Sequence, residues 1–203
     1  MKLILPHHRW SESASPIAHP SLVGMAPNAM KTRAILLLLI FVSTLPAAED
    51  KVVVPGLRVG TVSLMEKLSS VKSELGSLSF EDAAMGRLWA AWIVDARDGR
   101  IAVFCLRPDE HTFVVQRILV TSPKYATASG ISVGSTFSQI NKLFPEMTEG
   151  ATYQSSFQKR RITVYHCSAR GIAFEFPAEP KPSEQCIGFI IHPMGMTITG
   201  NAF

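Results

Sequence analysis

The sequence predicts an α+β domain in which two tandem α-β-β-β repeats build an antiparallel sheet with helices packed on one face. A short glycine pattern occurs twice, as PGLRVG at 55–60 and SGISVG at 129–134. Each copy precedes a stretch with the apolar spacing of an amphipathic helix. Three short apolar runs, typical of strands, follow each helical stretch. The repeats therefore extend over about residues 52–123 and 126–193.

Each repeat is expected to open with a helix that begins at a capping box, in which a side chain and a backbone N–H pair reciprocally. The boxes are formed by Ser63 with Glu66 and by Thr136 with Gln139. Apolar side chains then recur at helical spacing, at Leu64, Leu68, Val71 and Leu75 and at Phe137, Ile140, Leu143 and Phe144. Gly76 is expected to end the first helix and Pro145 the second, since neither residue continues a helix well.

The strand-like runs follow in the same order in both repeats. They are 88–96, 100–106 and 113–121 in the first repeat, and 162–167, 171–176 and 186–192 in the second. A turn at Asp98-Gly99 is expected to join the first two runs of the first repeat. Alternation predicts Ile101, Val103 and Cys105, and Ile172, Phe174 and Phe176, on the face toward the helices. Phe104 and Glu175 are then expected on the opposite, open face.

A glycine pattern that leads into a Ser- or Thr-initiated helix, repeated in an α/β chain, resembles the β-lactamase-inhibitor-protein-like fold, itself a tandem repeat. A single copy is similar to the small lipoprotein of the outer-membrane β-barrel assembly machinery. The resemblance covers nearly all of residues 52–193 and implies protein binding by a sheet face and loops. It departs in two respects. No cysteine stands directly after the N-terminal apolar segment, where lipid attachment would need one, and Cys105, Cys167 and Cys186 do not reproduce the inhibitors' disulfides.

The N-terminal region has the pattern of an export signal at residues 30–48. A basic MKTR segment precedes the apolar run AILLLLIFV and a small-residue segment ending at Ala47-Ala48. The apolar run is much shorter than the about 20 residues needed to span a membrane, so we expect cleavage and no stable membrane span. We interpret residues 1–29 as a mis-assigned or disordered extension. Residues 49–203 then form a single mature domain, exported to the periplasm or secreted.

The charge of the mature region excludes one class of partner. The chain has 20 Lys and Arg and 16 Asp and Glu residues. Four of the basic residues and one acidic residue precede residue 49, which leaves 16 basic and 15 acidic residues. Nucleic-acid binding needs a concentrated basic surface, so no nucleic-acid partner is predicted.

The cysteines and histidines form no motif for catalysis, a metal or a cofactor, and none is predicted. Three cysteines follow residue 48, so at least one is unpaired; whether two are bridged stays open. Cys105 and His111 are separated by a polar loop. His166 and Cys167 are adjacent, so they point to opposite faces of a strand. Cys186 and His192 would lie roughly 20 Å apart along a strand, too far to share a metal ion.

Four aromatic residues are candidates for a binding surface: Trp89, Trp92, Phe104 and Tyr165. Aromatic side chains are enriched where proteins bind partners. Trp89 and Trp92 are three residues apart and cannot share one face of a regular strand, so at least one is expected in the core. Phe104 and Tyr165 are expected on the open face.

These observations favour an exported, non-catalytic binding module that binds another envelope or secreted protein through the sheet face and hairpin loops. A second hypothesis is a periplasmic binder of a small molecule or an envelope polymer, held in a groove between the repeats. A third is an exported hydrolase of a type that no motif in the sequence identifies.

Overall fold

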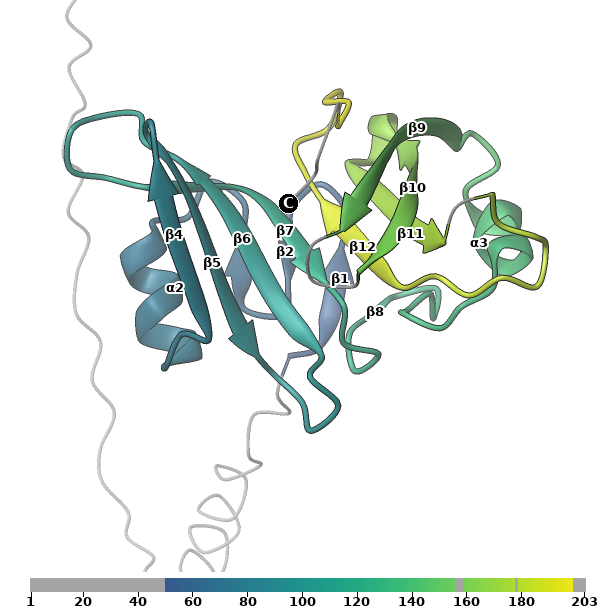
Figure 1. The fold of residues 1–203 in the computed structure, drawn as a ribbon, viewed down its shortest axis with the longest axis horizontal. Helices are drawn as coiled ribbons and strands as arrows, with labels where there is room; N and C mark the ends of the chain where they lie inside the picture. Colours follow the sequence, from purple (N-terminus) through teal and green to yellow (C-terminus); the bar gives the residue numbers. More distant parts are fainter. Residues whose placement is uncertain (1–49, 156–158, 178, 199–203) are drawn as a thin grey trace, which may run out of the picture. The chain divides into compact units, whose positions relative to one another are not determined.

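A computed structural model describes residues 50–155, 159–177 and 179–198, which form an α+β domain rich in antiparallel strands (Figure 1). Its main sheet has eight strands in the order β4-β5-β6-β7-β12-β11-β10-β9. These are β4 Phe80–Ala84, β5 Arg87–Ile93, β6 Arg100–Leu106, β7 Val114–Val120, β12 Gly188–Ile191, β11 Ile172–Pro177, β10 Arg160–Cys167 and β9 Thr148–Ser155. All neighbouring strands of this sheet are antiparallel.

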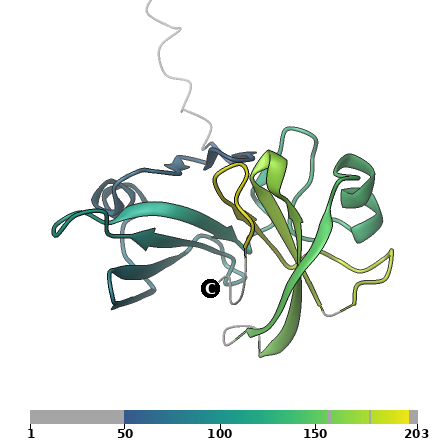
Figure 2. The same cartoon turned by 90° about the horizontal axis from the view of Figure 1, so that it is seen from above.

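The strand order divides the sheet into two halves. Strands β4 to β7 follow the chain across one half, and β12 to β9 run back across the other. The halves join where β7 pairs with β12, with Phe189 opposite Val120 and Ile191 opposite Ile118. Figures 1 and 2 show the blue-to-teal half and the green-to-yellow half meeting at this pair. The last strand of each half therefore lies at the centre of the sheet.

A small second sheet has the order β3-β2-β1-β8. Its strands are β1 Val52–Val54, β2 Arg58–Val59, β3 Val62–Ser63 and β8 Ala126–Thr127. Strands β1 and β8 pair in parallel, so the segments that carry the two glycine patterns lie beside one another.

Strands β4 and β9 were not among the runs predicted from the sequence, and they form the two edges of the main sheet. All five residues of β4 are exposed, and β9 is mostly polar and contains Gly150. Polar residues are common on edge strands, where they oppose pairing with other chains. Neither segment therefore shows the apolar alternation from which strands are recognised.

The second helix agrees with the prediction and the first does not. Helix α3, Phe137–Leu143, begins at the Thr136 capping box, whose hydroxyl accepts a hydrogen bond from the Gln139 N–H. Helix α2, Leu68–Leu75, ends at Gly76 as expected but begins one turn later than predicted. Ser63 donates its N–H to Glu66, but Met65 has a φ of 63°, which is left-handed and interrupts a helix there. A short 3₁₀ helix, η1, spans Ser168–Arg170.

Alternate strand residues face two sides of the main sheet. The residues on one side, here named the core face, belong to the larger buried cluster. This cluster also includes Leu68 and Val71 of α2 and Ile140 of α3. Its strand residues include Trp92, Ile101, Val103, Cys105, Ile172, Phe174 and Phe176. The opposite side, the open face, carries Trp89, Phe104 and Glu175, whose strand neighbours point into that cluster. A smaller buried cluster covers part of the open face in the second half.

Gly171 joins the small sheet to the turn between β10 and β11. Its carbonyl accepts a hydrogen bond from Gly56 at 3.1 Å, and its φ is 70°. A Cβ atom on Gly171 would lie 2.4 Å from the His192 carbonyl oxygen and 2.6 Å from the Gly56 Cα. Only glycine fits at this left-handed position, because backbone atoms of two segments occupy the space of a side chain.

We therefore expect Gly171→Ala to lower the free energy of unfolding by about 3 kcal/mol, which combines backbone strain with a clash against main chain. Urea unfolding followed by circular dichroism measures this loss. Gly130→Ala is the control, since Gly130 has a φ of 80° but open space around its Cβ position. That variant should lose only about 1 kcal/mol. Equal losses would show that the close approach at Gly171 adds nothing to the backbone strain.

Candidate functional site

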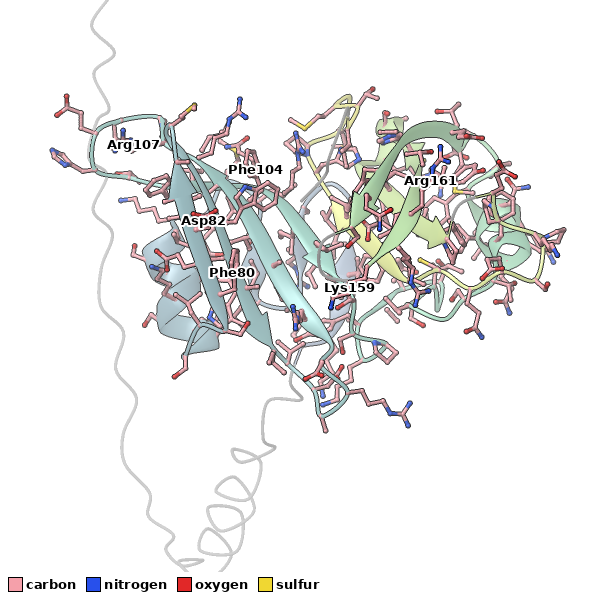
Figure 3. All side chains as sticks on the ribbon, in the orientation of Figure 1. Phe80, Asp82, Phe104, Arg107, Lys159 and Arg161 are labelled. Atoms are coloured by element: carbon pink, nitrogen blue, oxygen red, sulfur yellow. The ribbon has the colours of Figure 1, made fainter. Side chains whose placement is uncertain are left out.

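The open face contains a groove of about 830 Å³ to which both halves of the sheet contribute. The first half supplies Phe80, Asp82, Trp89, Ala91, Ala102 and Leu119, with the loop residues Arg97 and Asp98. The second half supplies Tyr153, Ser155, Glu175 and Ile187. Figure 3 labels Phe80 and Asp82 on β4, together with Phe104 on β6. The volume lies in the range of sites that bind small ligands.

The groove is hollow because a row of small side chains crosses its floor. Phe80 lies opposite Ala91, Ala91 opposite Ala102, and Ala102 opposite Leu119, so these residues share one face of four strands. The two central members are methyl groups, and they leave space between larger neighbours. Trp89, two residues from Ala91, stands on the same face and borders this space.

An aromatic pair is held beside this floor. The Trp89 and Phe104 rings have centroids 4.5 Å apart and are inclined by 45°. The Arg117 guanidinium lies 5.1 Å from the centroid of Phe104, within the range of a cation–π interaction. Burial lowers the pKa of Arg117, and the nearby Arg87 lowers it further. These contacts fix Phe104 and orient Trp89 at the border of the groove.

Glu175 is the most unusual residue of the groove, because it is a carboxylic acid that is only 1% exposed. Its Oε1 accepts a hydrogen bond of 2.5 Å from the Tyr153 hydroxyl. Its Oε2 has no hydrogen-bond partner among the described residues. Burial raises the pKa of Glu175 to about 7, and the Tyr153 hydrogen bond opposes part of that rise. The carboxyl group is therefore partly protonated at neutral pH.

Gly188 provides the space in which this carboxyl group lies. Gly188 is opposite Glu175 in the pairing of β11 with β12. A Cβ atom at Gly188 would lie 2.7 Å from Glu175 Oε2 and 3.4 Å from Leu119 Cδ1. The carboxyl group thus extends from β11 over β12 toward the first half of the sheet, at the centre of the open face.

The loop between β5 and β6 borders one end of the groove with Arg97 and Asp98. Asp95 organises this loop by accepting hydrogen bonds of 2.9 Å from the N–H groups of Arg97 and Gly99, and one from the Ser122 hydroxyl. The Ser122 hydrogen bond is the main cause of the lowered pKa of Asp95. The loop has six residues, 94–99, which is longer than the tight turn predicted at Asp98-Gly99.

The four aromatic candidates from the sequence lie in three different settings. Trp89 borders the groove, and Phe104 contacts it on the open face. Trp92 is 1% exposed on the core face, where its indole N–H donates to the Gly76 carbonyl at 3.1 Å. Tyr165 was expected on the open face. Its ring centroid lies 5.1 Å from that of Phe137 in α3, so Tyr165 lies on the core side instead.

Sequence reasoning did not single out Tyr153, and it placed Glu175 on the open face without assigning it to a site. One signal was available for Glu175, which interrupts the apolar run IAFEF of β11. A charged residue flanked by buried phenylalanines is rarely left without a specific environment. Nothing comparable marks Tyr153, because it lies in the polar edge strand β9.

The cysteines and the buried histidines lie apart from this groove lining. Cys105, Cys167 and Cys186 are buried free thiols, and burial raises the pKa of each, which makes a thiolate unfavourable. Burial lowers the pKa values of His166 and His192. Within residues 50–155, 159–177 and 179–198, no group of three or more His, Cys, Asp or Glu side chains could hold a metal ion. No helix in these ranges is long and apolar enough to cross a membrane.

No family model and no curated protein sequence matches the chain. Among solved structures, it is similar to the crystal structure of the uncharacterized protein yfeY from Escherichia coli. The identity is 15%, the TM-score is 0.47, and the match covers 70% of this chain and 99% of that chain.

Proposed function

We propose that this chain is an exported, non-catalytic binding module whose ligand lies in the groove on the open face. The observation that carries the proposal is a groove of about 830 Å³ lined by both halves of the sheet. Ligand sites combine a mostly apolar wall with a few well-placed polar groups, and here those groups are Glu175, Tyr153, Arg97 and Arg100. A small molecule, or a short part of an envelope polymer, fits such a groove.

In this proposal the two halves are copies of one unit, with helices on the core face, as in the β-lactamase-inhibitor-protein-like fold. The order of elements supports it: α2 precedes β4-β5-β6-β7, and α3 precedes β9-β10-β11-β12. The mirrored strand order supports it further, because it brings the last strands of the two copies together. Duplication would thus have created the groove at the junction between the copies.

Export is part of the proposal. The signal peptide at 30–48 and the extension at 1–29 lie outside the described residues and stay predictions. An exported protein would present the groove to ligands in the periplasm or outside the cell. Mass spectrometry of the mature N-terminus tests this, since cleavage should leave a chain beginning at Ala48, Glu49 or nearby.

A second candidate function is the binding of a protein through strand β4. Every residue of this edge strand is exposed, and Met85 in the adjoining turn is 98% exposed. An extended peptide can pair with such an edge and add a strand to the sheet. This mode of binding would bypass the groove, so it is distinguishable from the first proposal.

The groove proposal predicts that filling the floor abolishes binding without unfolding the protein. Ala102→Leu adds bulk at the centre of the floor, where Ala102 lines the groove. A thermal-shift screen of small molecules and envelope polymer fragments should yield a compound that raises the melting temperature of the wild-type chain. We expect that shift to disappear in the variant, while its circular dichroism stays unchanged.

Ala83→Leu is the matched control, because Ala83 is an exposed residue of β4 that lies outside the groove. This variant should keep the full thermal shift. A ligand whose shift survives Ala102→Leu but is lost in Ala83→Leu would contradict the groove proposal and favour binding at the β4 edge.

A further inference from the structure

We propose that the groove takes a neutral, hydroxyl-rich ligand, a short oligosaccharide, and that Glu175 pairs with one of its hydroxyl groups. This inference rests on the proposed binding function and names the chemical class of its ligand. It depends on three features of the groove: its balance of charge, the unpartnered atom of Glu175, and the aromatic border beside a floor of methyl groups.

The positive and negative charges of the groove's side chains balance, so the groove does not select a charged ligand. Asp82 and Asp98 are matched by Arg97 and Arg100. Glu175 is the remaining ionisable carboxyl group, and its burial disfavours the charged form. Charge complementarity therefore favours a neutral ligand that can both donate and accept hydrogen bonds.

Glu175 supplies the point of recognition. Tyr153 occupies Oε1, while Oε2 has no hydrogen-bond partner within the part of the chain that the structure describes. A buried polar atom without a partner is costly and is rare in folded proteins unless a ligand, ion or water satisfies it. A hydroxyl group can accept from the protonated carboxyl group and donate to the ionised one. An ammonium group could pair only with the ionised form.

The border of the groove suits a ligand that is polar at its edge and apolar on its face. Trp89 and the 40% exposed Phe80 present aromatic surface beside Ala91 and Ala102. A pyranose ring has C–H groups on its faces and hydroxyl groups around its rim. It can therefore cover the aromatic and methyl surface while its rim reaches the polar groups, a combination that a purely apolar or a strongly ionic ligand lacks.

The test is calorimetric titration of the full chain with maltotriose, cellotriose and chitotriose, and with spermidine as a cationic probe. We expect at least one trisaccharide to bind and spermidine not to bind. Glu175→Leu, which cannot pair with a hydroxyl group, should weaken the trisaccharide by about tenfold or more. Glu175→Gln keeps hydrogen-bonding capacity and should bind within about threefold of the wild type.

Glu81→Leu is the matched control. Glu81 is the neighbour of Asp82 on β4, but it pairs with Ala90 and forms a salt bridge of 2.6 Å with Lys72 of α2, on the core side of the strand. Its replacement should leave trisaccharide affinity unchanged. Circular dichroism of each variant checks folding. Should the leucine variant unfold, Glu175→Met, which is unbranched like glutamate and equally unable to pair with a hydroxyl group, takes its place with the same expected loss.

The outcomes separate this inference from the function on which it rests. If no trisaccharide binds, or if Glu175→Leu and Glu175→Gln are folded and both bind as the wild type does, the inference is wrong. The oligosaccharide class is wrong, but the groove proposal stands, in either of two cases. In the first, spermidine binds in preference to the trisaccharides. In the second, a ligand without hydroxyl groups binds the wild type and loses that binding in Ala102→Leu. Trisaccharide binding that is indifferent to both Ala102→Leu and Glu175→Leu overturns both proposals.

Discussion

Replacement of Trp92 by alanine should lower the free energy of unfolding by about 3–5 kcal/mol, the usual cost of removing a large aromatic side chain from a packed core. Trp92 is 1% exposed and belongs to the larger buried cluster on the core face. Its indole N–H also donates to the Gly76 carbonyl at the end of α2, so the variant loses a link between helix and sheet. Urea unfolding at constant pH measures the loss.

Trp89→Ala is the matched control for this prediction, because it removes the same side chain from the same strand. Trp89 lies on the open face, where it contacts Phe104 and borders the groove, and it is only partly buried. We expect it to cost less than half as much stability as Trp92→Ala and to reduce ligand binding. Equal losses of stability in the two variants would contradict the assignment of the two indoles to different faces.

The division of these two tryptophans shows which parts of the fold the sequence could predict. A strand with one face in the core must alternate, so the spacing of three residues excluded a shared face. The same alternation placed Phe174 and Phe176 on the core face and Glu175 on the open one. The second helix was equally predictable, because the Thr136 capping box is a local interaction that needs no tertiary context.

Tyr165 shows why other residues could not be placed in this way. In β10 the alternate residues Ile162 and Val164 enter the smaller buried cluster on the open face, while Tyr165 packs toward α3. Both faces of this strand are covered: Cys167 is buried on the side of Tyr165, as Ile162 and Val164 are on the other, so alternation does not distinguish the two sets. The segments that cover each face decide which way a residue of β10 points. One of these segments carries Ile198, which is more than 30 residues further along the chain.

The groove itself was beyond prediction for a related reason. Its floor and its carboxyl group come together only because β7 pairs with β12, which sets Leu119 opposite Ile190. That register joins segments far apart in the sequence and fixes which side chains meet across the centre of the sheet. The sequence indicated a groove between two repeats as one hypothesis, but it could not name Tyr153 or the role of Gly188 as its parts.

Glu175→Gln should remove a pH dependence of stability from the wild-type chain. The pKa of Glu175 is about 7 in the folded protein, against an ordinary value of 4.5. The folded state therefore holds a proton that the unfolded state releases between pH 4.5 and 7. Stability from this group is fully present below pH 4.5 and is lost as the pH rises to 7. A rise of this size corresponds to about 3 kcal/mol.

The variant cannot ionise, so its free energy of unfolding should exceed that of the wild type by about 3 kcal/mol more at pH 8 than at pH 4.5. Urea unfolding of both proteins across this range gives the difference directly. The comparison of the two proteins is needed because His166 and His192 also make stability depend on pH. Their pKa values are lowered in the folded state, so they make the stability of each protein rise with pH. Their contribution cancels between the two proteins. Parallel curves would show that the pKa of Glu175 in the folded chain is not raised above its ordinary value, and that burial does not keep a proton on this carboxyl group.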